Sequence, residues 1–402
     1  MKVLVLAGGA DQIALINELK KRGHYIVLAD YFTNPPAKSY ADRHIVASTL
    51  DVEAIRRIAS DEKVDLVTTA CTDQALLTVA KVSEDLSLPC YITYQKGLNV
   101  TNKSYMKNVL LQNNIPTARF IILNKVDTDA IRDFTFPLVV KPVDCNSSKG
   151  VRKVETIEDL PLYLKAAIEC SRTKTAIVEE YKQGMEISAD FYVEGTKAKF
   201  LCATSSAKIN NKDSFTILSS DYPAISKEQE EIITSIGNRI AQVFDLKDCP
   251  LFIQLIVNKK DVSIIEFSAR MGGGSKYNLI NVLSGVNIME KYVERILGGR
   301  PSVNPSKKMN YCKMVYIYCT PGIFDHIEGF EELKRQNVIK DYFQYKTSGM
   351  EITKAETSGD RPAGYLVVAD TLNELNSKVQ FANSSVKIIS SNGDDIMMHN
   401  LI

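Results

Sequence analysis

Two apolar runs, Phe252-Ile-Gln-Leu-Ile-Val257 and Val262-Ser-Ile-Ile-Glu-Phe-Ser-Ala-Arg270, stand on either side of a short polar segment. Their length and their content of β-branched and aromatic residues predict a β-hairpin. We expect a three-residue loop, Lys259-Lys260-Asp261, between the two strands. That loop length sets Gln254 opposite Glu266, with both side chains on one face of the hairpin.

Glu266 is the residue of this hairpin that most needs a partner, because it stands within Ile-Ile-Glu-Phe, where an unpaired buried carboxylate is costly. A divalent cation removes that cost, and Mg²⁺ is typically held by one or two carboxylates together with nucleotide phosphates. We therefore expect Gln254, Glu266 and Ser268 to be metal ligands. Arg270 offers a planar fork to a phosphate or carboxylate, and Gly272-Gly273-Gly274 allows a substrate to approach the backbone. The alternative is a partly exposed glutamate on an edge hairpin.

A lysine ends a second apolar run, Leu138-Val-Val-Lys-Pro142. Lys141 is either a phosphate-binding residue at a cleft or a surface lysine whose stem lies along the protein. The next segment, Asp144-Cys-Asn-Ser-Ser-Lys-Gly150, is rich in small residues whose backbone N–H groups can turn toward a phosphate. It lacks the G-x-x-x-x-G-K-[ST] pattern of a P-loop, and taken alone it is an ordinary hairpin loop.

A third apolar run, Ile177-Val-Glu-Glu-Tyr181, ends in two acids and is followed by Gly184 and Glu186. This pattern is compatible with a hinge at which backbone groups pair with an adenine edge. A carboxylate a few residues further on can then accept a hydrogen bond from a ribose hydroxyl. Solvent-facing acids at the end of a strand are the simpler interpretation of the run in isolation.

Composition excludes several classes of protein. The chain has 402 residues, with 49 Lys and Arg against 48 Asp and Glu, and this balance gives no general attraction to nucleic acid or anionic membranes. No apolar run approaches the roughly 18 residues that span a bilayer, and Gly8-Gly9 interrupt the first run too early for a signal peptide. Eight cysteines without a C-x-x-C pair and four scattered histidines indicate reduced thiols in a cytoplasmic protein without a histidine zinc site.

The first hundred residues alternate short apolar runs with helical segments, which predicts a Rossmann-like parallel sheet. We expect strands near 3–6, 25–29, 66–69 and 90–92. The first turn lacks G-x-G-x-x-G, which disfavours a nicotinamide enzyme. Asp73, after the third of these strands, either faces a substrate or caps a helix.

The rest of the chain predicts mixed α+β structure. Residues 118–220 read mainly as strands, 227–243 as a long amphipathic helix and 280–297 as helical. We place boundaries near residues 100 and 305, which gives a domain at 1–100, a central domain at 101–305 with a smaller lobe at about 118–195, and a C-terminal α+β subdomain at 306–402.

Taken in this order, the segments resemble the ATP-grasp superfamily, from Lys103 to about Asn281. The resemblance implies a Rossmann-like N-terminal domain followed by a two-lobed ATP-grasp fold with ATP between the lobes. The tail, Arg361-Pro-Ala-Gly-Tyr-Leu-Val-Val368 followed by Thr371-Leu-Asn-Glu-Leu375, resembles the C-terminal subdomain of carboxylate–amine ligases. L-amino-acid ligases and carbamoyl-phosphate-synthetase-like proteins are the most similar groups.

The resemblance also implies roles for individual residues. It assigns nucleotide contacts to residues of several segments: Lys103 and Lys141 to phosphates, Ser147, Ser148 and Gly150 to the triphosphate, Glu179, Glu180 and Tyr181 to adenine, and Glu186 to the ribose. It assigns Mg²⁺, or Mn²⁺ in its place, to Glu266, Gln254 and Ser268. Arg270 would hold an acyl phosphate and act with Lys141 in catalysis.

Two positions depart from the usual ATP-grasp pattern. The family usually has an acid where Gln254 stands, although carbamoyl-phosphate synthetase domains also have Gln. It usually has Asn where Ser268 stands, within Glu-x-Asn-x-Arg. Fewer negative ligands predict a weaker second metal site.

The function implied is an ATP-dependent ligase that joins a carboxylate, an amino acid or related small acid, to an amine. The reaction would pass through an acyl phosphate and release ADP and phosphate. We expect small-molecule partners and no nucleic acid or membrane, and a homodimer is compatible with the fold. The alternatives are carbamoyl-phosphate-synthetase-like phosphorylation of a small carboxylate or carbamate, and a nucleotide-binding protein without catalysis.

Overall fold

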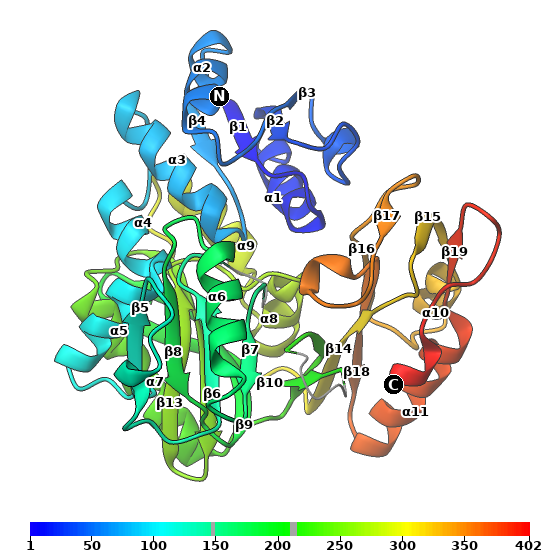
Figure 1. Cartoon of the computed structure of the whole chain (residues 1–402). Helices are drawn as coiled ribbons and strands as arrows, with labels where there is room; N and C mark the ends of the chain where they lie inside the picture. Colours follow the sequence, from blue (N-terminus) through cyan, green and yellow to red (C-terminus); the bar gives the residue numbers. More distant parts are fainter. Residues whose placement is uncertain (146–148, 210–214) are drawn as a thin grey trace.

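The first unit of the chain is a parallel sheet with helical connections, as the sequence predicts. The computed structural model describes residues 1–145, 149–209 and 215–402. The sheet has the order β3-β2-β1-β4, and all of its pairings are parallel. Its strands are β1 (Lys2–Leu6), β2 (Tyr25–Asp30), β3 (Arg43–Val46) and β4 (Leu66–Thr68), and its helices are α1 (Ala10–Lys20), α2 (Val52–Asp61) and α3 (Asp73–Asp85). The unit lies at the top of Figure 1.

The strand expected at residues 90–92 is absent, and that prediction is wrong. These residues connect α3 to α4 (Tyr94–Thr101) without strand structure. They are apolar because they pack against the central domain: Ile92 belongs to its core, and the Tyr91 hydroxyl donates to the Ala269 carbonyl at 2.9 Å.

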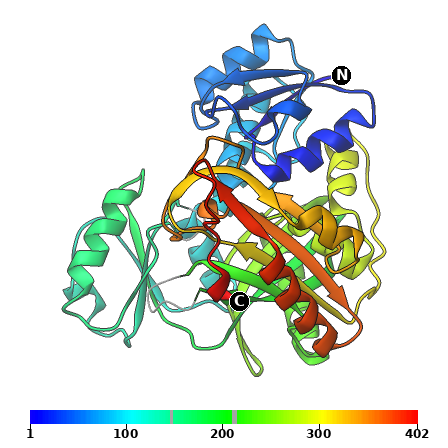
Figure 2. The same cartoon turned by 90° about the vertical axis from the view of Figure 1, so that its right-hand side faces the viewer.

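A small lobe follows. It consists of a four-stranded sheet in the order β5-β8-β6-β7, covered by one helix, with α5 leading into it from the central domain. The elements are α5 (Lys103–Gln112), β5 (Phe120–Leu123), β6 (Leu138–Pro142), β7 (Arg152–Val154), α6 (Leu160–Cys170) and β8 (Ala176–Glu180). Apolar residues of α6 and the sheet form a core of their own. Figure 2 shows this lobe standing to one side of the molecule.

The central and C-terminal parts of the chain share one antiparallel sheet of eight strands, in the order β13-β12-β9-β10-β11-β14-β18-β16. Its strands are β9 (Met185–Glu194), β10 (Lys197–Lys208), β11 (Ile217–Tyr222), β12 (Cys249–Asn258), β13 (Asp261–Ser268), β14 (Tyr311–Ile317), β16 (Asp341–Gln344) and β18 (Ala363–Ala369). The helices α7 (Lys227–Val243), α8 (Lys276–Ser284) and α9 (Ile288–Ile296) belong to the central domain.

The C-terminal part adds a smaller sheet and two helices. A three-stranded sheet in the order β17-β15-β19 packs with the last helix on the C-terminal half of the large sheet, around buried residues such as Phe324 and Tyr365. These elements are β15 (Gly322–Glu328), α10 (Phe330–Arg335), β17 (Glu351–Ile352), α11 (Leu372–Ser385) and β19 (Lys387–Ser390). Within the described residues, no helix is long and apolar enough to cross a membrane.

The β12–β13 hairpin pairs Gln254 with Glu266 as expected, although the expected loop is wrong. The turn has two residues, so Asn258 pairs with Asp261. A β-bulge in β13, opposite the step from Gln254 to Leu255, shifts the register by one residue. The shift brings Gln254 opposite Glu266 after all, because the extra residue of β13 compensates for the shorter turn.

The packing of α7 on β9 gives the first prediction. A Cβ at Gly237 would lie 2.8 Å from the Phe191 ring, so Gly237→Ala overpacks this contact although alanine favours a helix. We expect a loss of about 1–3 kcal/mol in unfolding free energy, measured by denaturant titration. The exposed Ser235→Ala in the same helix is the control and should change it by less than about 0.5 kcal/mol. A Gly237→Ala protein as stable as the wild type would contradict this packing.

Candidate active site

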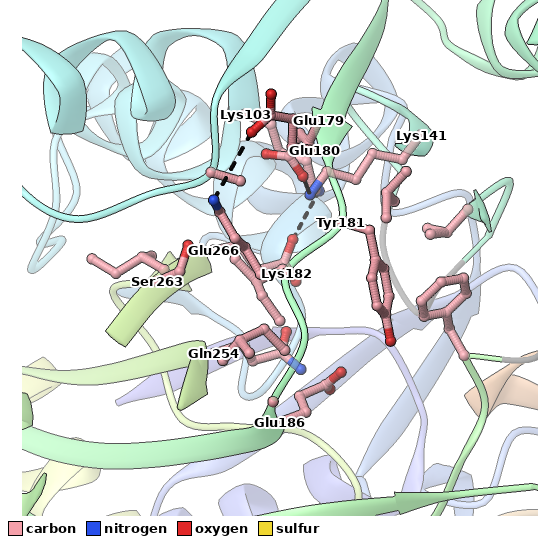
Figure 3. Close-up of a pocket in the computed structure, with 18 of the residues that line it drawn as sticks. Lys103, Lys141, Glu179, Glu180, Tyr181, Lys182, Glu186, Gln254, Ser263 and Glu266 are labelled. Carbon is pink, nitrogen blue, oxygen red and sulfur yellow. Dashed lines mark ion pairs between the residues drawn. The ribbon is translucent and has the colours of Figure 1, made fainter. Parts of the chain in front are cut away.

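A cavity of about 360 Å³ lies between the small lobe and the large sheet; we call it the lysine cavity. Its walls come from α5, β6, β8 and the chain after it, and from β9, β10, β12 and β13. Eight of the residues singled out from the sequence line it: Lys103, Lys141, Glu179, Glu180, Tyr181, Glu186, Gln254 and Glu266. Figure 3 shows these side chains around the opening.

Lys103 connects α5 with the hairpin. Asn102 caps α5 through the Tyr105 N–H, and this places Lys103 in the first turn. The Lys103 ammonium lies 3.1 Å from the Glu266 carboxylate and donates to the Cys145 carbonyl at 2.8 Å. Burial alone would lower the pKa of Lys103, but the Glu266 carboxylate outweighs it and raises that pKa. Lys103 is therefore a firmly charged cation that faces the lysine cavity.

Glu179 lies between two buried lysines. Its carboxylate oxygens are 2.6 Å from the Lys107 ammonium and 2.5 Å from the Lys141 ammonium. Lys107 also donates to Thr117 at 2.6 Å and to the Ile264 carbonyl at 2.9 Å. Burial would raise the pKa of Glu179, yet the two ammonium groups hold it at about 2. Burial lowers the pKa of Lys107 to about 8.

The segment after β8 follows the expected hinge only in part. The backbone N–H groups of Glu180 and Tyr181 donate to the Arg119 and Pro137 carbonyls, each at 3.0 Å. These two donors are therefore occupied by hydrogen bonds within the small lobe. The Tyr181 ring lines the lysine cavity and packs 4.7 Å from the Lys153 ammonium. Adenine contacts of Glu179, Glu180 and Tyr181 therefore stay predictions.

Glu186, expected at the ribose, lies at the start of β9 with its carboxylate 2.5 Å from the Lys208 ammonium. Gly150 has φ +74°, and a Cβ there would lie 2.9 Å from Pro142, so the loop needs glycine at this position. Ser147 and Ser148 lie outside the described residues.

Arg270 and Ser268 meet a residue of the first unit. The Arg270 guanidinium donates from Nε and Nη2 to the two oxygens of Asp73, at 2.7 and 2.5 Å, and Ser268 donates to the same carboxylate. Burial would raise the pKa of Asp73, but Arg270 holds it below its usual range. The N-cap of α3 is Thr72, so Asp73 does not cap this helix. Its carboxylate instead contacts Arg270 and Ser268 at the site. A metal-ligand role for Ser268 stays a prediction.

A second cavity, of about 600 Å³, continues from Glu266 and Gln254 toward the C-terminal part; we call it the arginine cavity. Arg270, Lys276 and Arg361 line it, together with the chain after β4. The Lys276 ammonium donates to Ser188 and lies 3.8 Å from Asp190. The two cavities thus share the wall that carries Gln254 and Glu266.

The donor set at this wall fits a hard cation only modestly. Glu266 and Gln254 are opposite residues of one hairpin, and they offer carboxylate and amide oxygens, which Mg²⁺ prefers. Among the described residues, no three Asp, Glu, His or Cys side chains cluster as a metal site. A cation held here would therefore depend on Glu266, on an amide and on oxygens from a ligand.

Three charged side chains near the two cavities received no role from the sequence. Lys107 follows Lys103 by one helical turn, and this i, i+4 spacing on a helix with apolar neighbours was a usable signal. Asp190, 3.8 Å from the Lys276 ammonium, and Arg361, which lines the arginine cavity, gave no such signal, because their places depend on elements far apart in the sequence.

A family model for the ATP-grasp domain matches residues 134–278, which include the described walls of the lysine cavity from β6 to β13. This part of the chain belongs to the ATP-grasp family.

Several relatives match the chain over nearly its whole length. A phosphoribosylamine–glycine ligase of Methanocaldococcus jannaschii is 22% identical over 96% of this chain and 94% of that protein. An L-amino acid ligase from Bacillus licheniformis superimposes with a TM-score of 0.79 at 20% identity, covering 97% of this chain and 99% of that chain. The biotin carboxylase domain of Hydrogenobacter thermophilus 2-oxoglutarate carboxylase was solved with MgADP, ADP and bicarbonate. It superimposes with a TM-score of 0.81 at 16% identity, covering 99% of this chain and 92% of that chain. These likenesses confirm the predicted fold.

The ion pairs of Glu179 predict how the unfolding free energy of the protein depends on pH. Because the pKa of Glu179 falls from 4.5 to about 2 on folding, the unfolded chain binds more protons between these values, and unfolding free energy falls as pH is lowered through them. We expect this carboxyl to contribute roughly 3 kcal/mol above pH 5, lost toward pH 2.

Denaturant titrations from pH 6 to pH 2 on the wild type and on Lys107→Met/Glu179→Gln test this expectation. The double variant removes the carboxylate with one of its lysines, so its stability should fall less steeply over this range. If the unfolding free energy of the two proteins falls equally steeply with pH, Glu179 is not the titrating group.

Proposed function

We propose that this chain is an ATP-dependent ligase that joins a small carboxylate, such as an amino acid, to an amine through an acyl phosphate. ATP would occupy the lysine cavity, and the acid and the amine would occupy the arginine cavity. The observation that carries the proposal is that Gln254 and Glu266 stand on the wall common to both cavities. A phosphate at this wall would lie within reach of both a nucleotide and a substrate.

Positive charge from the small lobe and α5 favours phosphate binding in the lysine cavity. Lys103 and Lys141 point into it from different elements, and their partners Glu266 and Glu179 fix their positions. Mg²⁺, if held by Glu266 and Gln254, would neutralise charge on the transferring phosphate. The protein otherwise positions the groups and keeps out water, since an acyl phosphate hydrolyses readily.

The chemistry needs no protein nucleophile. The substrate carboxylate attacks the γ-phosphorus, and the bond to the β-phosphate oxygen breaks to release ADP. The amine then attacks the acyl carbon, loses a proton, and phosphate leaves. Arg270, fixed by Asp73 and by the Met271 carbonyl at 2.7 Å, lies beside this route and would stabilise the anionic oxygens.

The second candidate is phosphorylation of a small carboxylate or carbamate without transfer to an amine. It is favoured by Gln254 in place of an acid, which carbamoyl-phosphate synthetase domains share. Bicarbonate is the simplest probe: ADP release with Mg-ATP and bicarbonate alone supports this candidate, whereas release that needs a carboxylate and an amine together supports the ligase.

Glu266 provides the direct test of the site. Glu266→Gln keeps the shape but removes the charge, and we expect ADP release with Mg-ATP and a panel of amino-acid pairs to fall roughly 100-fold or more. Asp261→Asn, an exposed change at the start of the same strand, is the control and should leave turnover intact. Far-UV circular dichroism shows whether the variant is still folded. Full ADP release by Glu266→Gln would overturn the site.

Gln254 makes a gain of function possible. Gln254→Glu adds a carboxylate opposite Glu266, and metal affinity rises with ligand charge. We expect half-maximal ADP release at an Mg²⁺ concentration lowered about tenfold. Gln344→Glu, on the exposed edge of β16, should not change it. An unchanged or higher Mg²⁺ requirement in Gln254→Glu would remove Gln254 from the metal site.

A further inference from the structure

Two half-buried cysteines meet between the segment after β6 and the end of α6. The Cys145 and Cys170 sulfurs are 3.7 Å apart, and Cys170 is the last residue of α6. Both side chains are partly exposed, so a small reagent in solvent can reach them. The sulfurs of a disulfide are about 2 Å apart, and a modest approach of the two side chains is therefore enough to form the bond.

The backbone beside this pair is already joined by hydrogen bonds. The Thr173 N–H donates to the Asp144 carboxylate at 3.1 Å, and the Arg172 guanidinium donates to the Asp144 carbonyl at 3.2 Å. The residue before Cys145 is thus bonded to the turn after Cys170. A cross-link between chain segments that already lie side by side needs no rearrangement of the small lobe.

Cys145 stands between the two cavities. It lines both of them, whereas Cys170 lines the arginine cavity and not the lysine cavity. Lys103 lines the lysine cavity and not the arginine cavity, and its ammonium donates to the Cys145 carbonyl at 2.8 Å. A bond to Cys170 therefore draws Cys145 toward the arginine cavity and away from Lys103.

Cys170 is the less movable of the two partners. It belongs to the last turn of α6, where the Ser171 N–H donates to the Ala167 carbonyl at 3.1 Å. A Cβ at Gly150 would lie 3.5 Å from the Cys170 sulfur, so the backbone turn at this glycine packs close to the sulfur. Cys145 is therefore the residue that moves when the two sulfurs approach.

The protonation of Cys145 sets the pace of such a reaction. Burial, and then the hydrogen bond with Cys170, raise the pKa of the Cys145 thiol to about 11. The thiolate is the reactive form, so oxidation at neutral pH is slow. A thiol of high pKa is also a poor leaving group, so a disulfide formed here is reduced slowly. The pair is suited to sustained oxidation and not to a brief pulse.

We propose that Cys145 and Cys170 are a redox modification site, at which oxidation joins the two side chains in a disulfide that weakens nucleotide binding in the lysine cavity. The oxidant is a small disulfide such as oxidised glutathione. One protein thiolate attacks a sulfur of the reagent, a mixed disulfide forms, and one reduced thiol leaves. The second protein thiolate attacks the protein sulfur of this mixed disulfide, and a second reduced thiol leaves. The protein loses two protons and two electrons, which the reagent gains.

Formation of the bond is tested on the wild type, Cys170→Ser and Cys90→Ser. Cys90 is the matched control, because it is a half-buried cysteine that lines neither cavity. The proteins are equilibrated with oxidised glutathione at mildly alkaline pH without air, alkylated, and digested with trypsin without reduction. We expect the peptides 133–149 and 166–172 to be joined in the wild type and in Cys90→Ser, but not in Cys170→Ser. Wild-type protein with glutathione adducts or free thiols instead of this cross-link would overturn the inference.

The effect on the nucleotide is measured as the affinity of a fluorescent, non-hydrolysable Mg-ATP analogue. We expect the oxidised wild type and oxidised Cys90→Ser to bind it about fivefold or more weaker than their reduced forms. Reduction with dithiothreitol should restore the affinity, and Cys170→Ser should give equal affinities after both treatments. Equal affinities of the oxidised and reduced wild type would overturn the proposed effect.

Linkage gives an independent measurement of the same coupling. If the disulfide weakens nucleotide binding, a saturating Mg-ATP analogue must disfavour the disulfide by the same factor. Half-oxidation of the wild type should then need a glutathione buffer about fivefold or more richer in the oxidised form, and an unshifted midpoint would contradict the coupling. The nucleotide effect rests on the proposed function, whereas the disulfide does not. A protein that binds no analogue in either form would count against the proposed function, and the cross-linked peptides would then decide the modification site.

Discussion

The Glu179 carboxylate, held between Lys107 and Lys141, is the interaction on which the geometry of the cleft depends. Lys141 comes from β6 of the small lobe, whereas Lys107 comes from α5 and also bonds to the Ile264 carbonyl of β13 in the large sheet. One buried anion therefore ties the small lobe to the large sheet. Loss of a single partner would leave an uncompensated buried charge, so the relative position of the two walls is strongly constrained.

The first unit completes the site and cannot be regarded as a separate module. Its Asp73 holds Arg270, and its Asp11 accepts backbone N–H groups at the start of α8. Tyr292 of α9 donates in turn to the Thr69 carbonyl at 2.7 Å. Each of these contacts uses a group of the first unit just after the carboxyl end of a parallel strand or in the first turn of the helix that follows. This edge is where ligands meet sheets of this kind. The boundary near residue 100 thus divides the sequence but not the site.

Local pattern predicted the elements of the cleft well and its contacts poorly. Periodicity and apolar runs were sufficient for the hairpin, for Lys141 and for the parallel sheet, because each depends on residues close in sequence, whereas the role of Lys103 was implied by the family resemblance. The pairing of Gln254 with Glu266 was correct only because a bulge offset a shorter turn, and no propensity signals such a bulge. Asp73 and Arg270 are almost two hundred residues apart, and the apolar residues 90–92 pack between units rather than in a sheet. Such features follow from the tertiary arrangement alone.

Arg270 shows how the protein fixes a cation beside the proposed route of the reaction. Arg270 has its fork occupied by Asp73 and a third donor by the Met271 carbonyl, and the Phe252 ring lies 5.5 Å away. It cannot turn toward a ligand without breaking these bonds, so it contributes a stationary positive charge. A stationary charge favours an anion that forms during reaction, because no reorganisation is needed.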